Sequence, residues 1–175
     1  MKVGKLNFEP AQDNLGLTGE PTKQSIETNK LEGILVSEID PDLSDTAAFC
    51  EKYEIGLEMS VNCVIVECQR AERTWYAACL VPATARADIN GIVRRELDAR
   101  KISFAPMEKA TSLSNMAYGA ISPIGLPADW PILVHEEAAK LKHAVIGSGV
   151  RQSKLLVPGD LFPKLPNAKV LSLTK

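Results

Sequence analysis

Residues 61–68 read VNCVIVEC, and residues 74–81 read TWYAACLV. Both runs are rich in apolar and β-branched side chains, and the polar segment between them, residues 69–73, is typical of a hairpin loop. Strands that are apolar almost without interruption are usually buried on both faces. We therefore predict a central, buried β-hairpin over residues 61–81.

Shorter helix and strand patterns occupy the chain on both sides of this hairpin. Asp42 and Ser44 are candidate N-caps for one helix, and Asp88 is a candidate N-cap for another. The predicted strands cover residues 33–39, 102–105, 118–122, 132–135, 144–146, 154–157 and 169–171, and the predicted helices cover residues 43–54, 89–97, 107–113 and 158–165. Hairpins and helix-linked strands therefore both occur.

This mixture predicts an α/β fold, a single domain with a curved mixed sheet flanked by short helices. A chain of 175 residues has the length of one ordinary domain. Residues 1–22 are polar and lack sustained periodicity, so we expect an N-terminal extended arm that lies on the domain or is partly disordered. Residues 23–175 then form the domain itself.

Composition and charge exclude several classes of protein. Hydrophobic residues make up 45% of the chain, and no apolar run approaches the roughly 18 residues of a membrane span. Residues 1–10 contain no apolar stretch like a secretory signal, so we expect a cytoplasmic protein without a membrane partner. A net charge of −2 argues against coating nucleic acid by bulk charge, but it allows a local basic patch.

The four cysteines do not have the spacing of a metal site. Cys50, Cys63, Cys68 and Cys79 form no CxxC motif and no Cys/His pair at zinc spacing. We predict free thiols that are mostly buried, and we expect neither a metal nor another cofactor.

The segment YGAISPIGLP at residues 118–127 is the most unusual in the chain. Glycine allows a backbone to approach a ligand closely, and proline fixes a turn. One interpretation is a loop that presents backbone N–H and C=O groups to a small ligand, and the other is a structural transition from strand to loop. The candidate ligand-binding residues are Gly119, Ala120, Ile121, Ser122, Pro123 and Gly125.

A second glycine-rich segment, GSGVRQSK, covers residues 147–154. If strands flank it, it forms a turn that brings Ser148, Arg151 and Lys154 near one point, next to Gly147 and Gly149. Such a turn is either a site for an anion or a hydroxyl, or an ordinary β-turn with solvated charges.

Together these segments resemble a known family. The pattern Gly119-x-x-x-Pro123 is similar to the GxxxP loop of the YbaK / prolyl-tRNA-synthetase editing-domain superfamily. The hairpin, the ISFA strand at residues 102–105 and the PILV strand at residues 131–134 follow in the family's order, so the resemblance covers roughly residues 32–172. It implies a YbaK-like fold and hydrolysis, in trans, of the ester at the 3′ end of mischarged aminoacyl-tRNA. Because that ester is activated, a backbone site can position it without a catalytic triad.

The resemblance also implies roles for individual residues. It makes Asn62 and Gly119 the catalytic candidates, and Arg151 and Lys154 the tRNA-binding candidates. The substrate-binding candidates are Ala120, Ile121, Ser122, Pro123, Gly125, Gly147, Ser148 and Gly149. Asn62 stands where active members usually carry a lysine, and His135 stands where members often carry an aspartate. Asparagine forms hydrogen bonds but supplies no charge.

Three hypotheses follow from these assignments. The first is an editing hydrolase that uses Asn62 or the 2′-OH of the substrate. The second is a non-catalytic module that binds an aminoacyl-tRNA end or a small acyl ligand, and the third is a thiol enzyme that uses Cys63. Further basic residues are candidates for tRNA contact or simply form solvated faces; they are Arg94, Arg95, Arg100, Lys101 and Lys164.

Overall fold

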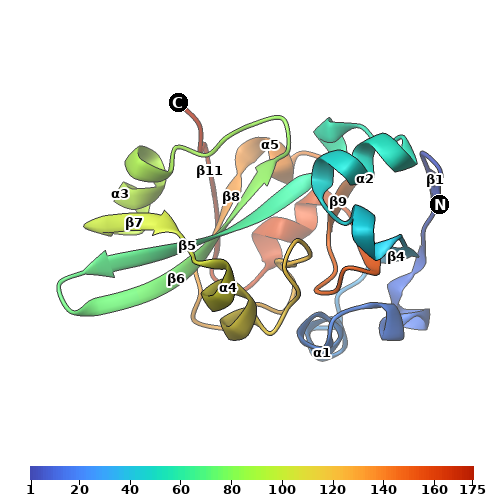
Figure 1. The fold of residues 1–175 in the computed structure, drawn as a ribbon, viewed down its shortest axis with the longest axis horizontal. Helices are drawn as coiled ribbons and strands as arrows, with labels where there is room; N and C mark the ends of the chain where they lie inside the picture. The colour runs from blue at the N-terminus through green and yellow to red at the C-terminus, as the bar shows by residue number, and fades with distance from the viewer.

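The computed structural model describes residues 1–175 as an α/β fold with three sheets (Figure 1). The strands are β1 (Lys2–Val3), β2 (Leu6–Asn7), β3 (Glu9–Pro10), β4 (Leu35–Glu38), β5 (Val61–Arg70), β6 (Arg73–Pro82), β7 (Lys101–Phe104), β8 (Ile132–His135), β9 (Ala144–Gly147), β10 (Ser153–Val157) and β11 (Ala168–Leu171). The α-helices are α1 (Glu20–Thr28), α2 (Thr46–Tyr53), α3 (Arg94–Glu96), α4 (Met107–Ser114) and α5 (Glu136–Ala139). None of the helices has the length and apolarity to cross a membrane.

The predicted hairpin is confirmed as the centre of the largest sheet. Strands β5 and β6 pair antiparallel from Val61↔Pro82 to Arg70↔Arg73, and β6 is the middle strand in the order β11-β8-β6-β5-β7. The second half of β6 is buried along its whole length, whereas the tip of the hairpin is exposed and projects from the molecule (Figure 1). The apolar run therefore marks the part of the hairpin that the rest of the fold covers.

The predicted α/β fold with a mixed sheet is confirmed, and the structure adds a second sheet of four strands. The five-stranded sheet is mixed, because β8 pairs parallel with both β6 and β11 while β5 pairs antiparallel with β6 and β7. Strands β3, β4, β10 and β9 form a separate antiparallel sheet, and only the bridge Ser60↔Val145 links the two. A sequence pattern places strands along the chain but does not tell which sheet each of them joins.

The predicted strand over residues 118–122 is wrong, because this segment is a loop. Its backbone carbonyls bond to side chains and turns and not to a neighbouring strand: Ser44 Oγ donates to Gly119 O, and the Gly149 N–H donates to Ala120 O. A positive φ of 76° at Gly119 turns the chain away from an extended path.

The predicted helix over residues 43–54 begins later than expected. Residues Pro41–Leu43 form a 3₁₀ turn, and α2 begins at Thr46 with Asp45 as its N-cap. Ser44 is not a cap, since its hydroxyl bonds to the distant Gly119. The cap predicted at Asp88 is confirmed, because its Oδ2 accepts the N–H of Ile92 at 3.1 Å.

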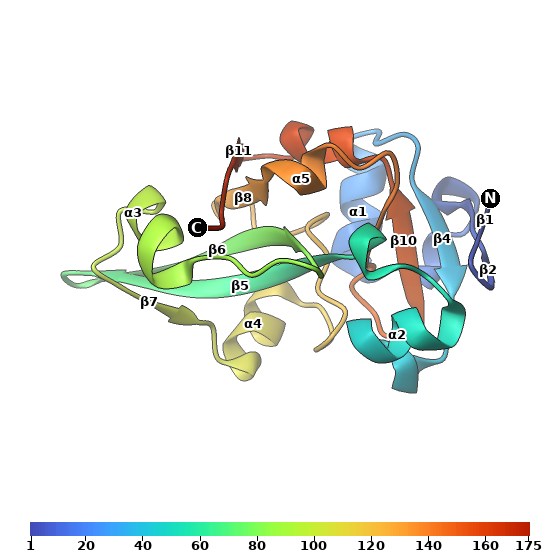
Figure 2. The ribbon, with the colours of Figure 1, turned by 90° about the horizontal axis from the view of Figure 1, so that it is seen from above.

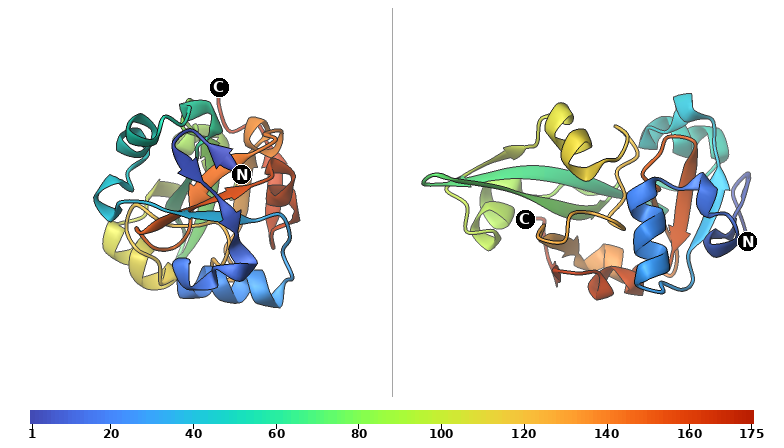
Figure 3. Two further views of the ribbon diagram at one scale, coloured as in Figure 1. Left: turned by 90° about the vertical axis from the view of Figure 1, so that its right-hand side faces the viewer. Right: turned by 90° about the horizontal axis from the view of Figure 1, so that it is seen from below.

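Residues 1–22 are packed onto the rest of the chain. Phe8 and Ala11 are completely buried, and β3 pairs with β4 at the edge of the four-stranded sheet. Helix α1 lies beside β10 in Figure 3, and the expected boundary at residue 22 falls inside this helix. The Gly19 N–H at the start of α1 donates to Ser148 O, which ties the helix to the turn between β9 and β10.

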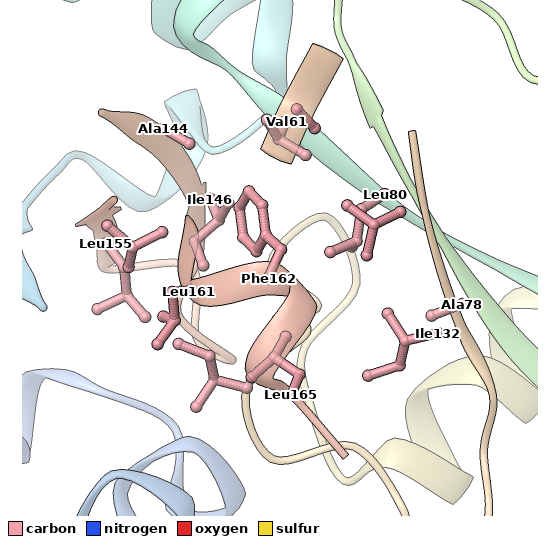
Figure 4. Close-up of a cluster of buried hydrophobic side chains, with 14 of the residues drawn as sticks. Val61, Ala78, Leu80, Ile132, Ala144, Ile146, Leu155, Leu161, Phe162 and Leu165 are labelled. Atoms are coloured by element: carbon pink, nitrogen blue, oxygen red, sulfur yellow. The ribbon is translucent and has the colours of Figure 1, made fainter. Parts of the chain in front are cut away.

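The main core lies where the two larger sheets meet. A cluster of 21 buried residues includes Leu80 and Ile132 from the five-stranded sheet and Ile146 and Leu155 from the four-stranded sheet. Figure 4 shows the ring of Phe162 between side chains of both groups. Burial of a Phe side chain contributes roughly 1.5–3 kcal/mol, so this cluster holds the two sheets in one fixed arrangement, and that arrangement positions the site described next.

Candidate active site

A cavity of about 750 Å³ opens between α2, the first half of β5 and α4. Figure 2 shows α2 and α4 on the same side of the hairpin, and the segment that joins α4 to β8 passes between them. Strands β9 and β10 supply the remaining wall. The lining is mostly apolar, and its only charged residues are Asp45, Arg151 and Lys154.

The cavity brings together part of the predicted site. The predicted residues in its lining are Asn62, Gly119, Ile121, Gly147, Arg151 and Lys154. The predicted residues outside its lining are Ala120, Ser122, Pro123, Gly125, Ser148 and Gly149. The first group comes from three separate parts of the chain, which only the tertiary structure joins.

Buried side chains outside the cavity hold the loop in place. Ser122 is completely buried, and its hydroxyl accepts the N–H of Ile124. Thr22 on α1 donates to Ile124 O at 2.8 Å. Ser148 is also completely buried, and its hydroxyl bonds to carbonyl oxygens of its own turn. These residues orient the walls of the cavity from behind.

Gly125 and Gly147 permit close packing of the loop. A Cβ on Gly125 would lie 2.5 Å from the backbone of Pro21, and a Cβ on Gly147 would lie 2.6 Å from the carbonyl oxygens of Ala120 and Ile121. Real Cβ atoms essentially never approach that closely. Only glycine at position 147 therefore lets the loop lie directly against β9.

Arg151 fixes the loop from the other side. Its Nη1 donates to Tyr118 O at 2.9 Å, and its Nε donates to Pro41 O at 3.1 Å. Ser44 completes the clamp with a 2.9 Å bond from its hydroxyl to Gly119 O. The carbonyls of residues 118 and 119 are thus occupied, and the peptide plane at Gly119 has a defined orientation.

Several N–H donors in the lining have no acceptor within the chain. The backbone N–H groups of Gly119 and Ile121 make no intramolecular hydrogen bond. Asn62 accepts a 2.8 Å bond at Oδ1 from the hydroxyl of Thr46, which leaves its Nδ2 group without an acceptor. Gly119 is exposed and Asn62 and Ile121 are half-buried, so these donors face the open cavity and are available to oxygen atoms of a ligand.

Lys154 is the most unusual charged residue of the lining. It is only 6% exposed, and its Nζ forms no ion pair and no hydrogen bond. The Nζ of Lys154 lies over the ring of Phe49, at 5.2 Å from the ring centroid. Burial lowers the pKa of Lys154 from 10.5 to about 8, although Asp45 and Cys50 partly oppose this shift.

Neither a cysteine nor a histidine has the properties of a catalytic base or nucleophile here. Cys63 lines the cavity, but burial and the neighbouring Cys79 raise the pKa of its thiol far above the usual range. His135 is buried, and its Nδ1 accepts the N–H of Leu173 at 3.0 Å outside the cavity. No group of three or more His, Cys, Asp or Glu side chains is arranged to hold a metal ion.

Sequence reasoning missed the residues at the rim of the cavity. Phe104, Met107 and Tyr118 belong to the lining and are mostly exposed. An isolated apolar residue in a sequence resembles a core residue, so no local signal marks Phe104 and Met107, and Tyr118 is marked only as the first residue of the segment YGAISPIGLP. Ser44 is a candidate only for the start of a helix, and no sequence signal marks Thr46. The contacts of Ser44 with Gly119 and of Thr46 with Asn62 depend on the fold.

The cluster of basic residues after the hairpin lies elsewhere. Arg94, Arg100 and Lys101 line a separate, polar hollow beside β7, together with Glu67. Arg94 also donates to the carbonyl of Asn90 within its own helical turn. Lys164 is exposed at the end of a 3₁₀ helix. None of these residues belongs to the lining of the main cavity.

Comparison with known proteins places this site in a family context. The family described as "Aminoacyl-tRNA editing domain" matches residues 40–165. No curated protein matches the chain. This family match covers every residue of the cavity lining.

Solved structures with the same fold have low sequence identity to this chain. One is a protein described as a candidate trans-editing enzyme for prolyl tRNA synthetase, with 16% identity, a TM-score of 0.76, and coverage of 90% of this chain and 96% of that chain. Another is a hypothetical protein named APE2540, with 17% identity, a TM-score of 0.76, and coverage of 89% and 100%. A third is a scaffold used for epitope backbone grafting, with 15% identity, a TM-score of 0.76, and coverage of 90% and 97%. At these identities the likeness establishes the fold.

Proposed function

Because this chain belongs to the aminoacyl-tRNA editing domain family, we propose that it hydrolyses the ester of mischarged aminoacyl-tRNA in trans. The products are a free amino acid and a tRNA that can be charged again. The substrate is the aminoacylated 3′ end of the tRNA, which we place in the cytoplasm. The structural neighbour described as a candidate trans-editing enzyme for prolyl tRNA synthetase is in keeping with this proposal.

The observation that carries the proposal is the set of unpaired donors in the cavity. The N–H groups of Gly119 and Ile121 and the Nδ2 group of Asn62 all belong to the lining and have no acceptor in the chain. An aminoacyl ester on a ribose is rich in acceptor oxygens. Donors fixed in advance stabilise the negative charge that develops on a carbonyl oxygen in the transition state, and they need no reorganisation.

The proposed reaction requires only water as the second reactant. Water adds to the carbonyl carbon, the bond from that carbon to the ribose 3′ oxygen breaks, and the proton of the water goes to that oxygen. Since the ester is already activated, correct positioning supplies a large part of the rate. The neighbouring 2′-OH of the substrate can relay the proton, because the lining contains no histidine and the Cys63 thiol remains protonated.

A second function deserves a test because of the residue at position 62. The resemblance implies a lysine there, and Asn62 instead forms a neutral hydrogen bond with Thr46. A module that binds an aminoacyl-tRNA end without hydrolysing it would use the same cavity and the same donors. The two functions therefore differ in turnover and not in the ligand.

A deacylation screen separates the two functions. The protein is incubated with a panel of mischarged tRNAs, and amino acid release and binding are measured on the same preparation. We expect release above the buffer rate for at least one tRNA, a loss of about tenfold or more in Asn62→Ala, and no loss in Asn90→Ala, which changes an exposed asparagine outside the cavity.

Binding without release would support the non-catalytic module and would contradict the hydrolase. A protein that neither binds nor deacylates any member of the panel would contradict both functions. A loss of activity in Asn90→Ala equal to that in Asn62→Ala would contradict the assignment of the cavity as the site of hydrolysis.

A further inference from the structure

The first turn of α2 faces the cavity without a cap. Its N-cap residue, Asp45, makes no side-chain hydrogen bond to the helix, and the N–H groups of Thr46 and Ala47 have no acceptor. All three residues belong to the cavity lining. The helix has eight residues, and the free N–H groups and dipole at such an N-terminus favour an anion.

Lys154 supplies a second and independent indication of an anion. Its side chain lines the same cavity, is 6% exposed and has no partner of opposite charge. The 5.2 Å distance from its Nζ to the Phe49 ring places it beside α2. Of the other charged residues in the lining, Arg151 is occupied by two carbonyl oxygens. Asp45 is exposed and forms no ion pair with Lys154, and its charge opposes the lowering of the Lys154 pKa without cancelling the effect of burial.

We propose that Lys154 and the first turn of α2 form a subsite that binds the 5′-phosphate of the terminal nucleotide of the substrate. This inference rests on the proposed function. In an aminoacylated terminal nucleotide the ester and the 5′-phosphate are attached to the same ribose, so the phosphate is the anionic group nearest to the ester. An ammonium group together with backbone N–H groups at a helix N-terminus is a common way of binding phosphate. A carboxylate on the side chain of an acidic aminoacyl group would offer similar anionic oxygens, and the experiment below distinguishes the two sources.

The burial of Lys154 agrees with a binding role. A charge that is largely removed from water and has no partner lowers the stability of the fold, so a lysine whose side chain lines a cavity is expected where a ligand completes its pairing. The titratable groups that face it are Asp45 and Cys50 on α2 and Arg151 in the turn before β10. Since the pKa of Lys154 in the empty site is about 8, this side chain loses its positive charge as the pH rises through that value. Phosphate binding should weaken over the same pH range.

The test compares adenosine with adenosine 5′-monophosphate by calorimetry. We expect the monophosphate to bind the parent protein about 10- to 100-fold more tightly than adenosine does, as for hydrogen bonds to a charged group. Lys154→Met should abolish this difference, and Lys142→Met, which removes an exposed lysine outside the cavity, should retain it. The difference should decrease between pH 7 and pH 9, a range in which the phosphate itself stays doubly charged because its second pKa is about 6.

Equal binding of the two compounds by the parent would overturn the phosphate subsite. A Lys154-dependent gain for an aspartyl adenosine analogue, with none for the monophosphate, would overturn it in favour of a carboxylate. If Lys154 discriminates phosphate in a protein that deacylates no tRNA, the subsite stands and the proposed function fails. If the protein deacylates tRNA and Lys154 does not affect phosphate binding, the function stands and the subsite fails.

Discussion

Lys154 is a single residue of the candidate site that lowers the stability of the fold. Its pKa falls from 10.5 to about 8 on folding because burial disfavours the charged form. Below about pH 8 the charged Lys154 therefore lowers the free energy of unfolding by its full amount, and this destabilisation decreases as the pH rises from about 8 to 10.5. The sign follows from linkage, since the unfolded chain binds more protons within that range.

We predict that Lys154→Met stabilises the protein at pH 7 by roughly 1–3 kcal/mol, because it removes a buried and unpaired charge. The gain should shrink toward zero above about pH 10. Urea unfolding of the variant and the parent across this range measures the effect, and Lys142→Met is the control for loss of an exposed lysine. A gain that stays constant with pH would show that the charge is not its cause.

Asn62 is the second residue whose chemistry decides activity. We predict that Asn62→Lys raises the rate of deacylation by about tenfold, because an ammonium group stabilises a developing oxyanion better than a neutral amide does. Steady-state release of amino acid from mischarged tRNA measures the change, with Asn62→Ala as the variant that only removes the amide. A parent that is active and becomes slower with lysine would show that Asn62 takes part in a different mechanism.

At the scale of the element, the loop before β8 depends on glycine at defined positions. Gly119 has a φ of +76°, which is unfavourable for a β-branched residue, yet its Cβ would meet only the flexible end of Arg151. We predict that Gly119→Val remains folded, with a loss of about 1–3 kcal/mol of stability, and loses deacylation by about 100-fold. Thermal unfolding and deacylation are measured on one preparation.

Gly125→Val is the matched control for this prediction. Its Cβ would lie 2.5 Å from the backbone of Pro21, so its defect should be mainly one of stability. A stable and fully active Gly119→Val protein would show that the loop at Gly119 does not contact the substrate.

A further prediction concerns the contact between the loop and β9. In Gly147→Ala the added Cβ would lie 2.6 Å from the carbonyl oxygens of Ala120 and Ile121, and these backbone atoms can clear it only if the loop itself moves. We expect the loop to shift, so that deacylation falls by about tenfold or more. Gly16→Ala is the control, since nothing lies within 4 Å of its added Cβ. Equal activity of the two variants would contradict the close approach.

At the scale of the whole molecule, one core joins the two larger sheets. Phe162 is completely buried in the cluster that contains residues of both sheets (Figure 4). We predict that Phe162→Ala lowers the free energy of unfolding by about 3–5 kcal/mol, whereas Phe104→Ala, which changes a residue that is 66% exposed, lowers it by less than about 1 kcal/mol.

The same core predicts cooperative unfolding. Circular dichroism follows both sheets, and the fluorescence of Trp75 and the buried Trp130 follows the packing of the side chains, so the two signals should change together in denaturant. Two separate transitions would show that the sheets fold as independent units.

The sequence by itself determined those elements whose signal is local. The apolar runs of β5 and β6, the strand at Ile132–His135 and the cap at Asp88 each follow from neighbouring residues, because periodicity and capping act over a few positions. The glycine and proline pattern likewise marked the loop at residues 118–127 as unusual before its conformation was known.

Only the tertiary structure decided how these elements combine. The division into two sheets, the loop in place of a strand at residues 118–122, and the partner of Ser44 all depend on contacts between distant parts of the chain. The same holds for Lys154, which a sequence presents as an ordinary basic residue. Its burial in a cavity wall results from the packing of α2 against β10, and that long-range packing gives it a lowered pKa and a place in the site.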